Sequence, residues 1–304
     1  MIQKHLFKDS IWIELDHPTQ DEVNTVMAEY NLHPHVAREL ASPSLKQRVE
    51  SYDDHLYLIL HFPAFKHTHN EQNVQEVDFV IGKNYVITVK YDTIDSLHKF
   101  SKLVEVDSIL KKDVQYEDPS FVFFGIMHEI YRSLLDEIAY LEDLIEDIES
   151  KIFKEREREM VFALSRVARN FLDLKKIIEQ HKEILDDLEH LGGAAFGVEF
   201  GRSAALIKVD YYKVRNLIRS NLELIQELRE TNNSLLNTKQ NEVMKTLTIL
   251  AFVTFPLSLI AAIFGMNTVG MPFTGSPYDF WIVILIMCSA AGCMFLYFKH
   301  KRWL

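Results

Sequence analysis

Two long stretches near the C-terminal end of the chain contain no charged residue. They cover residues 247–264 and 280–298 and are separated by a short polar loop. A helix needs ~20 apolar residues to cross the hydrocarbon core of a bilayer, and each stretch is close to that length. A buried core helix can have the same length, but two such stretches side by side at the end of a chain favour two membrane spans.

The charges beside these spans predict their orientation. The loop at residues 265–279 has no Lys or Arg, whereas Lys239 and Lys245 precede the first span and a basic tail at residues 299–304 follows the second. Basic residues accumulate on the cytoplasmic side of a membrane, and residues 1–14 show no secretory signal pattern. We therefore expect a two-span protein of a bacterial inner membrane with both termini in the cytoplasm.

Residues 1–120 have the pattern of a cytosolic α/β domain. The expected strands are rich in Val, Ile, Leu, Phe and Tyr and cover residues 11–15, 56–61, 77–81 and 85–90. Residues 81–84 predict a hairpin turn, and helices are expected at residues 19–31, 34–40 and 94–110, the first capped by Thr19 or Asp21. Together they predict a mixed sheet flanked by helices.

Residues 121–202 predict an acidic helical hairpin. Apolar residues follow a heptad spacing typical of a helix that packs on a partner: Leu134, Ile138, Leu141, Ile145, Ile148 and Ile152. Residues 129–159 hold eleven acidic side chains against five basic ones. This charge indicates either a solvated face or a reservoir that concentrates cations near a conduit. A second helix is expected at residues 159–190, ended by Gly192 and Gly193.

Residues 203–264 predict one long stalk helix that continues into the first span. They contain no glycine, and their single proline is Pro256. A helix of this length would reach ~93 Å, which a small chain cannot cover by itself. We infer self-association.

Small, hydroxyl and amide side chains form a stripe at the membrane end of this helix, together with the larger Met244 and Phe255. It comprises Asn241, Met244, Thr248, Ala251, Phe255, Ser258 and Ala262. Small residues also promote ordinary helix packing in membranes. The alternative is a pore lined by copies of the chain, with constrictions at Met244, Leu247 or Phe255 that can gate by excluding water.

Composition excludes several other classes of protein. The net charge of −11 disfavours a nucleic-acid partner. The motifs of nucleotide-binding loops and nucleophile elbows are absent from the sequence, so neither an enzyme nor a cofactor is expected. His67 and His69 fit an exposed loop better than a metal site. Cys288 and Cys293 lie in the second span, where cysteine is a small apolar filler.

The outer end of the first span carries the tripeptide Gly265-Met266-Asn267, and here the chain resembles the CorA family of divalent-cation channels. The resemblance extends to residues 241–248, 271–272 and 299–304, and into the soluble domain at residues 50–54 and 84–89. It covers essentially the whole chain.

This resemblance implies a funnel-shaped homopentamer whose first transmembrane helix lines the pore. It implies inward transport of Mg²⁺, with Co²⁺ or Ni²⁺ as lesser substrates. Gly265, Met266 and Asn267 match the selectivity motif, whose asparagine would hold a hydrated cation. Pore positions of the family match Asn241, Met244, Leu247 and Phe255. Mg²⁺ is also implied as a regulatory ligand, and Asp210 lies nearest to the family's regulatory aspartate.

Two departures from the family pattern leave alternatives open. Phe273 replaces an acidic residue after the motif, and the stalk segment that resembles the family's aspartate-bearing region, residues 211–214, ends in valine. A zinc-transporting, ZntB-like member of the same family is one alternative. A membrane-anchored regulatory or structural protein, whose hairpin merely tethers the acidic domain, is the other.

Overall fold

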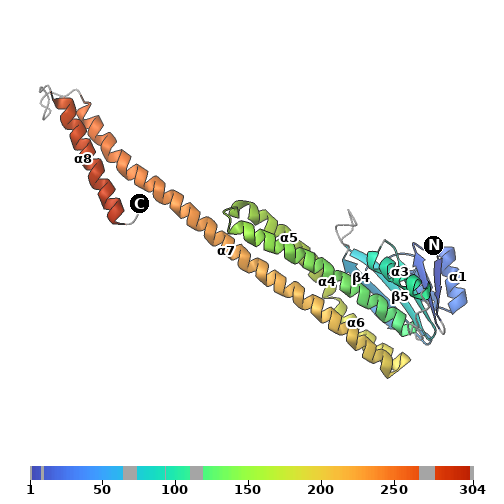
Figure 1. The fold of residues 1–304 in the computed structure, drawn as a ribbon. Coiled ribbons are helices and arrows are strands. Elements are labelled where there is room, and N and C mark those ends of the chain that lie inside the picture. Colours follow the sequence, from blue (N-terminus) through green and yellow to red (C-terminus); the bar gives the residue numbers. More distant parts are fainter. Residues whose placement is uncertain are drawn as a thin grey trace. The chain divides into compact units, whose positions relative to one another are not determined.

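The fold was analysed in a computed structural model that describes residues 2–7, 10–63, 74–92, 94–109, 119–266 and 278–301 (Figure 1). The chain divides into two compact units, Met1–Arg229 and Glu230–Leu304. The helix α7 (Val198–Phe264) belongs to both units. Each unit is described by itself.

A six-stranded mixed sheet forms the centre of the first unit. Its strands are β1 (Ile2–Leu6), β2 (Ile11–Asp16), β3 (Arg48–Ser51), β4 (His55–Pro63), β5 (Val74–Gly82) and β6 (Tyr85–Lys90). The spatial order is β1-β2-β6-β5-β4-β3, and β2 pairs with β6 in parallel while the other neighbours are antiparallel. The four expected strands, the hairpin between β5 and β6 and the mixed pairing are confirmed, whereas the short edge strands β1 and β3 were not anticipated.

Helices cover both faces of this sheet. α1 (Gln20–Tyr30) and α2 (Pro34–Glu39) pack on one face, where Ile13 and Leu15 of β2 join their core. Trp12 of the same strand points to the other face, and its ring lies 5.5 Å from that of Phe100 in α3 (Asp95–Ile109). This alternation is the period of two that a strand imposes. Thr19 caps α1 through a capping box with Glu22, as its position predicts.

Three helical segments pack together beyond the sheet. They are α4 (Pro119–Ile152), α5 (Glu157–Ile178) and the first part of α7. All six residues of the predicted heptad seam in α4 are buried, so the seam finds its partners within the chain. The Asn221 side chain of α7 donates a hydrogen bond of 2.7 Å to Glu142 of α4. Lys208 of α7 pairs with Asp186 and Glu189 of α6 (His181–Phe196).

The prediction of a single helix at residues 159–190 is wrong, because α5 ends at Ile178 and α6 begins at His181. Gly192 and Gly193 also lie inside α6 rather than after its end. A Cβ atom on Gly192 would lie 2.1 Å from the Phe200 ring, so this glycine is needed for close packing and not for a helix stop. The stop is Gly197, whose φ of 93° suits glycine.

A buried histidine fixes the junction between α5 and α6. His181 is fully buried, and its Nε2 lies 2.7 Å from the carbonyl oxygen of His61 in β4. A carbonyl oxygen can only accept, so Nε2 carries the proton and Nδ1 accepts a 2.8 Å hydrogen bond from the Tyr131 hydroxyl of α4. The neutral imidazole therefore joins the sheet, α4 and α6.

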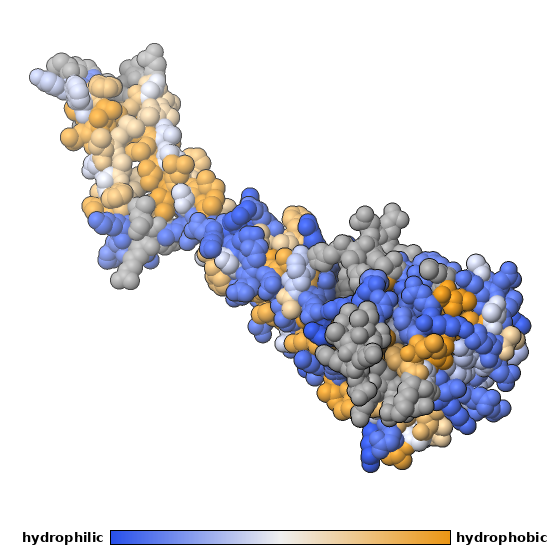
Figure 2. Space-filling view, turned by 45° about the vertical axis from the view of Figure 1, so that its right-hand side comes forward, coloured by the Kyte–Doolittle hydropathy of each residue, from blue (hydrophilic) through white to orange (hydrophobic). Residues whose placement is uncertain are grey.

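The second unit consists of the last part of α7 and of α8 (Asp279–His300). Both helices are long and apolar enough to cross a membrane, and the apolar window of each is not buried inside the chain. Figure 2 shows the orange hydrophobic surface that these two helices present. α7 stays helical through Pro256, which a transmembrane helix tolerates.

We expect His181 to make the first unit sensitive to acid. Burial lowers the pKa of His181 to about 4, so the unfolded chain binds more protons than the folded chain between the ordinary histidine pKa of ~6.5 and pH 4. Stability should fall as the pH drops through this window, by about 3 kcal/mol at pH 4. Thermal unfolding of the full chain in detergent should show a smaller acid-dependent loss in His181→Gln than in the unmodified protein.

The exposed histidine His98 provides the control for this measurement. His98→Gln should keep the pH profile of the unmodified protein. An unchanged profile in His181→Gln would contradict the role assigned to the buried imidazole.

Candidate ion pathway

The predicted pore stripe lies mostly on the more exposed side of the first span. The half-buried residues of the span are Ile249, Val253, Pro256, Leu257, Ile260 and Phe264, together with the stripe residues Thr248 and Ala251. At ~100° per residue, the stripe from Asn241 to Ala262 lies on roughly the opposite side. Asn241, Phe255 and Ser258 are exposed there. The exposed part of this stripe is therefore available to other copies of the chain.

The stripe offers oxygen atoms separated by apolar side chains. The Thr248 hydroxyl donates a 2.8 Å hydrogen bond to the Met244 carbonyl one turn earlier. Because its proton is engaged, the Thr248 oxygen presents lone pairs, which can accept hydrogen bonds from the water around a cation. Met244, Leu247 and Phe255 are 56%, 55% and 73% exposed and are the bulky side chains of this region that we predict to constrict the pathway.

The end of the first span places Gly265 and Met266 after the last turn of α7. The Gly265 amide donates a 2.9 Å hydrogen bond to the Ala261 carbonyl. A Cβ atom on Gly265 would lie 3.0 Å from that same oxygen, so a larger residue would crowd the helix end. The Met266 side chain is 58% exposed. Asn267 lies outside the described residues, and its role in selection stays a prediction.

The acidic face of α4 is solvent-exposed along much of its length. Four of its acidic side chains are exposed, namely Asp136, Asp143, Glu146 and Asp147, and beyond its end Glu155 and Glu159 are exposed as well. Other acidic side chains of α4 stabilise the fold. Glu129 is buried, and its Oε1 lies 2.9 Å from Nζ of Lys99. Both the solvated face and the cation reservoir remain compatible with this exposure.

Asp210, the candidate regulatory ligand, already has a partner within its own chain. Its Oδ2 lies 2.8 Å from Nδ1 of His128 in α4. A cation at Asp210 would have to compete with this contact or share the imidazole as a ligand. Asp210 as a metal site therefore stays a prediction.

The remaining candidates for chemistry are few. His67 and His69 lie outside the described residues. Cys288 and Cys293 are exposed free thiols of α8. In the ranges that the structure describes, there is no group of three or more metal-ligating side chains.

The cleft between α7 and α8 was not predicted from the sequence, because the residues that line the cleft come from two distant segments. Phe252 of α7 and Phe298 of α8 place their ring centroids 6.4 Å apart. A hydropathy pattern shows only that both residues are apolar. In the sequence, the feature that could have indicated this cleft is the excess of aromatic residues close to the basic tail.

Comparisons with known proteins agree along nearly the whole chain. A family model described as CorA-like Mg2+ transporter protein matches residues 7–300. The "Cobalt/magnesium transport protein CorA" of Thermotoga maritima is 25% identical and aligns with 98% of this chain and 85% of its own length.

Two solved structures are similar in fold. The complete CorA magnesium transporter of Methanocaldococcus jannaschii has a TM-score of 0.84 and 21% identity, and the match covers 99% of this chain and 94% of that one. The ZntB cytoplasmic domain of Vibrio parahaemolyticus has a TM-score of 0.61 and 8% identity over 76% of this chain and 90% of that one. At such identities the likeness shows the fold alone.

Cysteine labelling can test whether the stripe faces water. On a background without Cys288 and Cys293, cysteines at Thr248, Ala251 and Ser258 should react with a water-soluble thiol reagent in the open state. Leu257→Cys is a matched control, because Leu257 is next to Ser258 but is half-buried on another side of the helix. Equal protection at Ser258 and Leu257 would mean that the stripe packs against protein and lines no pore.

Proposed function

Because the chain belongs to the family of CorA-like Mg2+ transporters, we propose that it is an influx channel for divalent cations. Mg²⁺ is the main substrate, and Co²⁺ and Ni²⁺ are further substrates. The observation that carries this proposal is the stripe of α7, of which Asn241, Met244, Phe255, Ser258 and Ala262 are exposed in the single chain. A membrane tether would need neither this stripe nor Gly265 and Met266 at the end of the span.

We propose a homopentamer in which five copies of α7 surround the pathway. Polar groups within the span, such as Thr248 and Ser258, are costly to expose to hydrocarbon. Packing copies of α7 around a central axis removes these groups from lipid and gives them water. α8 then lies between α7 and the bilayer, which suits its uniformly apolar sequence.

Selection is proposed to act on the hydrated ion. Mg²⁺ gives up its water reluctantly, so a ring of neutral carbonyl oxygens from Asn267 can bind the ion through its water shell. Neutral oxygens hold a divalent cation more weakly than carboxylates do, which permits release and conduction.

The membrane potential can drive this transport without chemical fuel. With both termini in the cytoplasm, entry carries two positive charges toward the negative side of the membrane. Two charges that cross 100 mV gain ~4.6 kcal/mol. The exposed acidic side chains of α4 would raise the local cation concentration in the cytosolic domain.

The stripe favours Mg²⁺ over Zn²⁺. Zinc prefers nitrogen and sulfur ligands in a tetrahedral arrangement, and the stripe contains neither histidine nor cysteine. Its amide oxygen, hydroxyls and single thioether suit a hydrated hard cation. The zinc-transporting alternative is supported by likeness of fold alone.

We expect Asn267→Ala to abolish most divalent flux while the protein stays oligomeric on sizing in detergent. A hydrogen bond between a water and a neutral carbonyl contributes about 0.5–1.5 kcal/mol, so losing several of them in the ring should reduce flux by at least about tenfold. Asn216→Ala is the control, because Asn216 is an exposed amide in the cytosolic part of α7. Unmodified flux from a well-assembled Asn267→Ala protein would contradict the proposed filter.

Ion-selective flux into liposomes should separate magnesium from zinc. We expect Mg²⁺ influx that decreases as internal Mg²⁺ rises into the millimolar range, since weak carboxylate sites on the cytosolic helices would bind Mg²⁺ and hold a closed state. Influx without this decrease would reject Mg²⁺ as a regulatory ligand. Liposomes that pass Zn²⁺ but not Mg²⁺ would overturn the ion assignment.

A further inference from the structure

The cleft between α7 and α8 has a lining that changes from apolar to charged along its length. Its volume is about 480 Å³, and it is lined by Phe252, Cys293, Met294, Tyr297, Phe298 and Lys301. This size is typical of a site for a small ligand. Phe298 is only 6% exposed and closes the cleft against Phe252.

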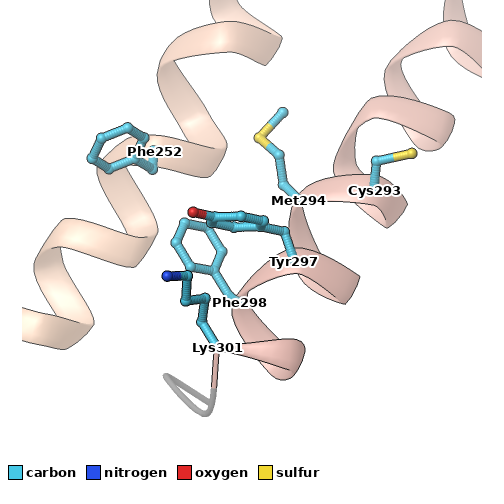
Figure 3. A pocket seen from close by; sticks show the side chains of 6 residues that line it. All are labelled: Phe252, Cys293, Met294, Tyr297, Phe298 and Lys301. Atoms are coloured by element: carbon cyan, nitrogen blue, oxygen red, sulfur yellow. The ribbon is translucent and has the colours of Figure 1, made fainter.

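The polar groups of the cleft gather at the end nearest the C-terminus. Figure 3 shows the Tyr297 hydroxyl and the Lys301 amino group directed into the space between the helices, with Met294 farther along α8. From Cys293 to Lys301 the α8 helix rises ~12 Å. The cleft therefore has an apolar end within the span and a cationic end at the membrane surface.

Lys301 makes no ion pair within the part of the chain that the structure describes. In the ranges described, no carboxylate lies within ion-pair distance of its amino group. Asp279, the one acidic residue after position 245, lies at the opposite end of α8. Within the described residues of this hairpin, Lys301 is therefore available to an anion from outside.

We propose that this cleft binds one anionic phospholipid of the cytoplasmic leaflet. The proposal rests on the membrane orientation proposed above. An acyl chain fills the apolar end beside Phe252 and Met294, while Lys301 and the Tyr297 hydroxyl hold the phosphate. Basic residues next to a span attract anionic lipids at the cytoplasmic surface, and the order of groups in the cleft matches the order of groups in such a lipid.

A second copy of the chain is the competing occupant. Glu242 precedes the first span and can supply a carboxylate at about the same depth. Such a contact would make Lys301 part of a subunit interface. It predicts that the loss of Glu242 or Lys301 weakens the oligomer and that lipid charge has no effect.

The test measures lipid retained by the full-length protein in native mass spectrometry. The protein is equilibrated with phosphatidylcholine alone or with phosphatidylcholine mixed with phosphatidylglycerol. We expect phosphatidylglycerol to bind about fivefold more tightly than phosphatidylcholine and Lys301→Gln to lose this preference. Lys299→Gln is the matched control, because Lys299 lies two residues away and does not line the cleft.

A second variant tests the apolar end of the cleft. Met294→Trp should fill the space and reduce lipid retention while Lys301 keeps its charge. Equal losses in Lys299→Gln and Lys301→Gln would indicate a diffuse surface potential and overturn the site. A retained preference in Lys301→Gln would overturn it as well.

Measuring oligomer dissociation distinguishes a second copy of the chain from a lipid as the occupant of the cleft. If Glu242→Gln and Lys301→Gln weaken the oligomer equally and phosphatidylglycerol shows no preference, the cleft is a subunit contact and the lipid site is rejected. Lipid retention is measured without ion flux. A protein that binds phosphatidylglycerol at Lys301 but passes no Mg²⁺ would reject the proposed function alone.

Discussion

The cost of placing polar side chains in hydrocarbon constrains the whole molecule. Thr248 and Ser258 lie within the span, on roughly the opposite side of α7 from Ile249, Val253 and Ile260. The Thr248 hydroxyl reduces part of this cost by donating to its own helix, yet its oxygen and the Ser258 hydroxyl still require polar surroundings. A single hairpin cannot supply polar surroundings. We therefore expect several copies of the chain to assemble around water.

Charge is divided between the two units in a way that suits conduction. The last 59 residues carry a net charge of +2, and the preceding part carries −13. Exposed carboxylates attract cations at long range, whereas a carboxylate inside the span would hold a divalent ion too firmly. The neutral oxygens of the stripe avoid such a trap. In the proposed channel, attraction and passage therefore fall to different segments of the chain.

The packing of the cytosolic unit shows where local patterns stop being informative. The heptad seam of α4 and the strands β2, β4, β5 and β6 follow from their periods of hydrophobicity. The edge strands β1 and β3 are short and partly exposed, so they lack that period. Gly192 resembles a helix stop in sequence, and only the Phe200 ring explains why it lies within α6.

By itself, the sequence determined the two spans, the polar stripe of α7 and the motif that begins at Gly265, because each depends on residues close together in the chain. Tertiary structure decided which side of α7 faces α8, how His181 joins β4 to α4, and that Lys301 shares a cleft with Phe252. Those features need segments tens of residues apart to meet. Periodicity encodes which face of a helix is apolar, but shape complementarity selects the surface that it covers.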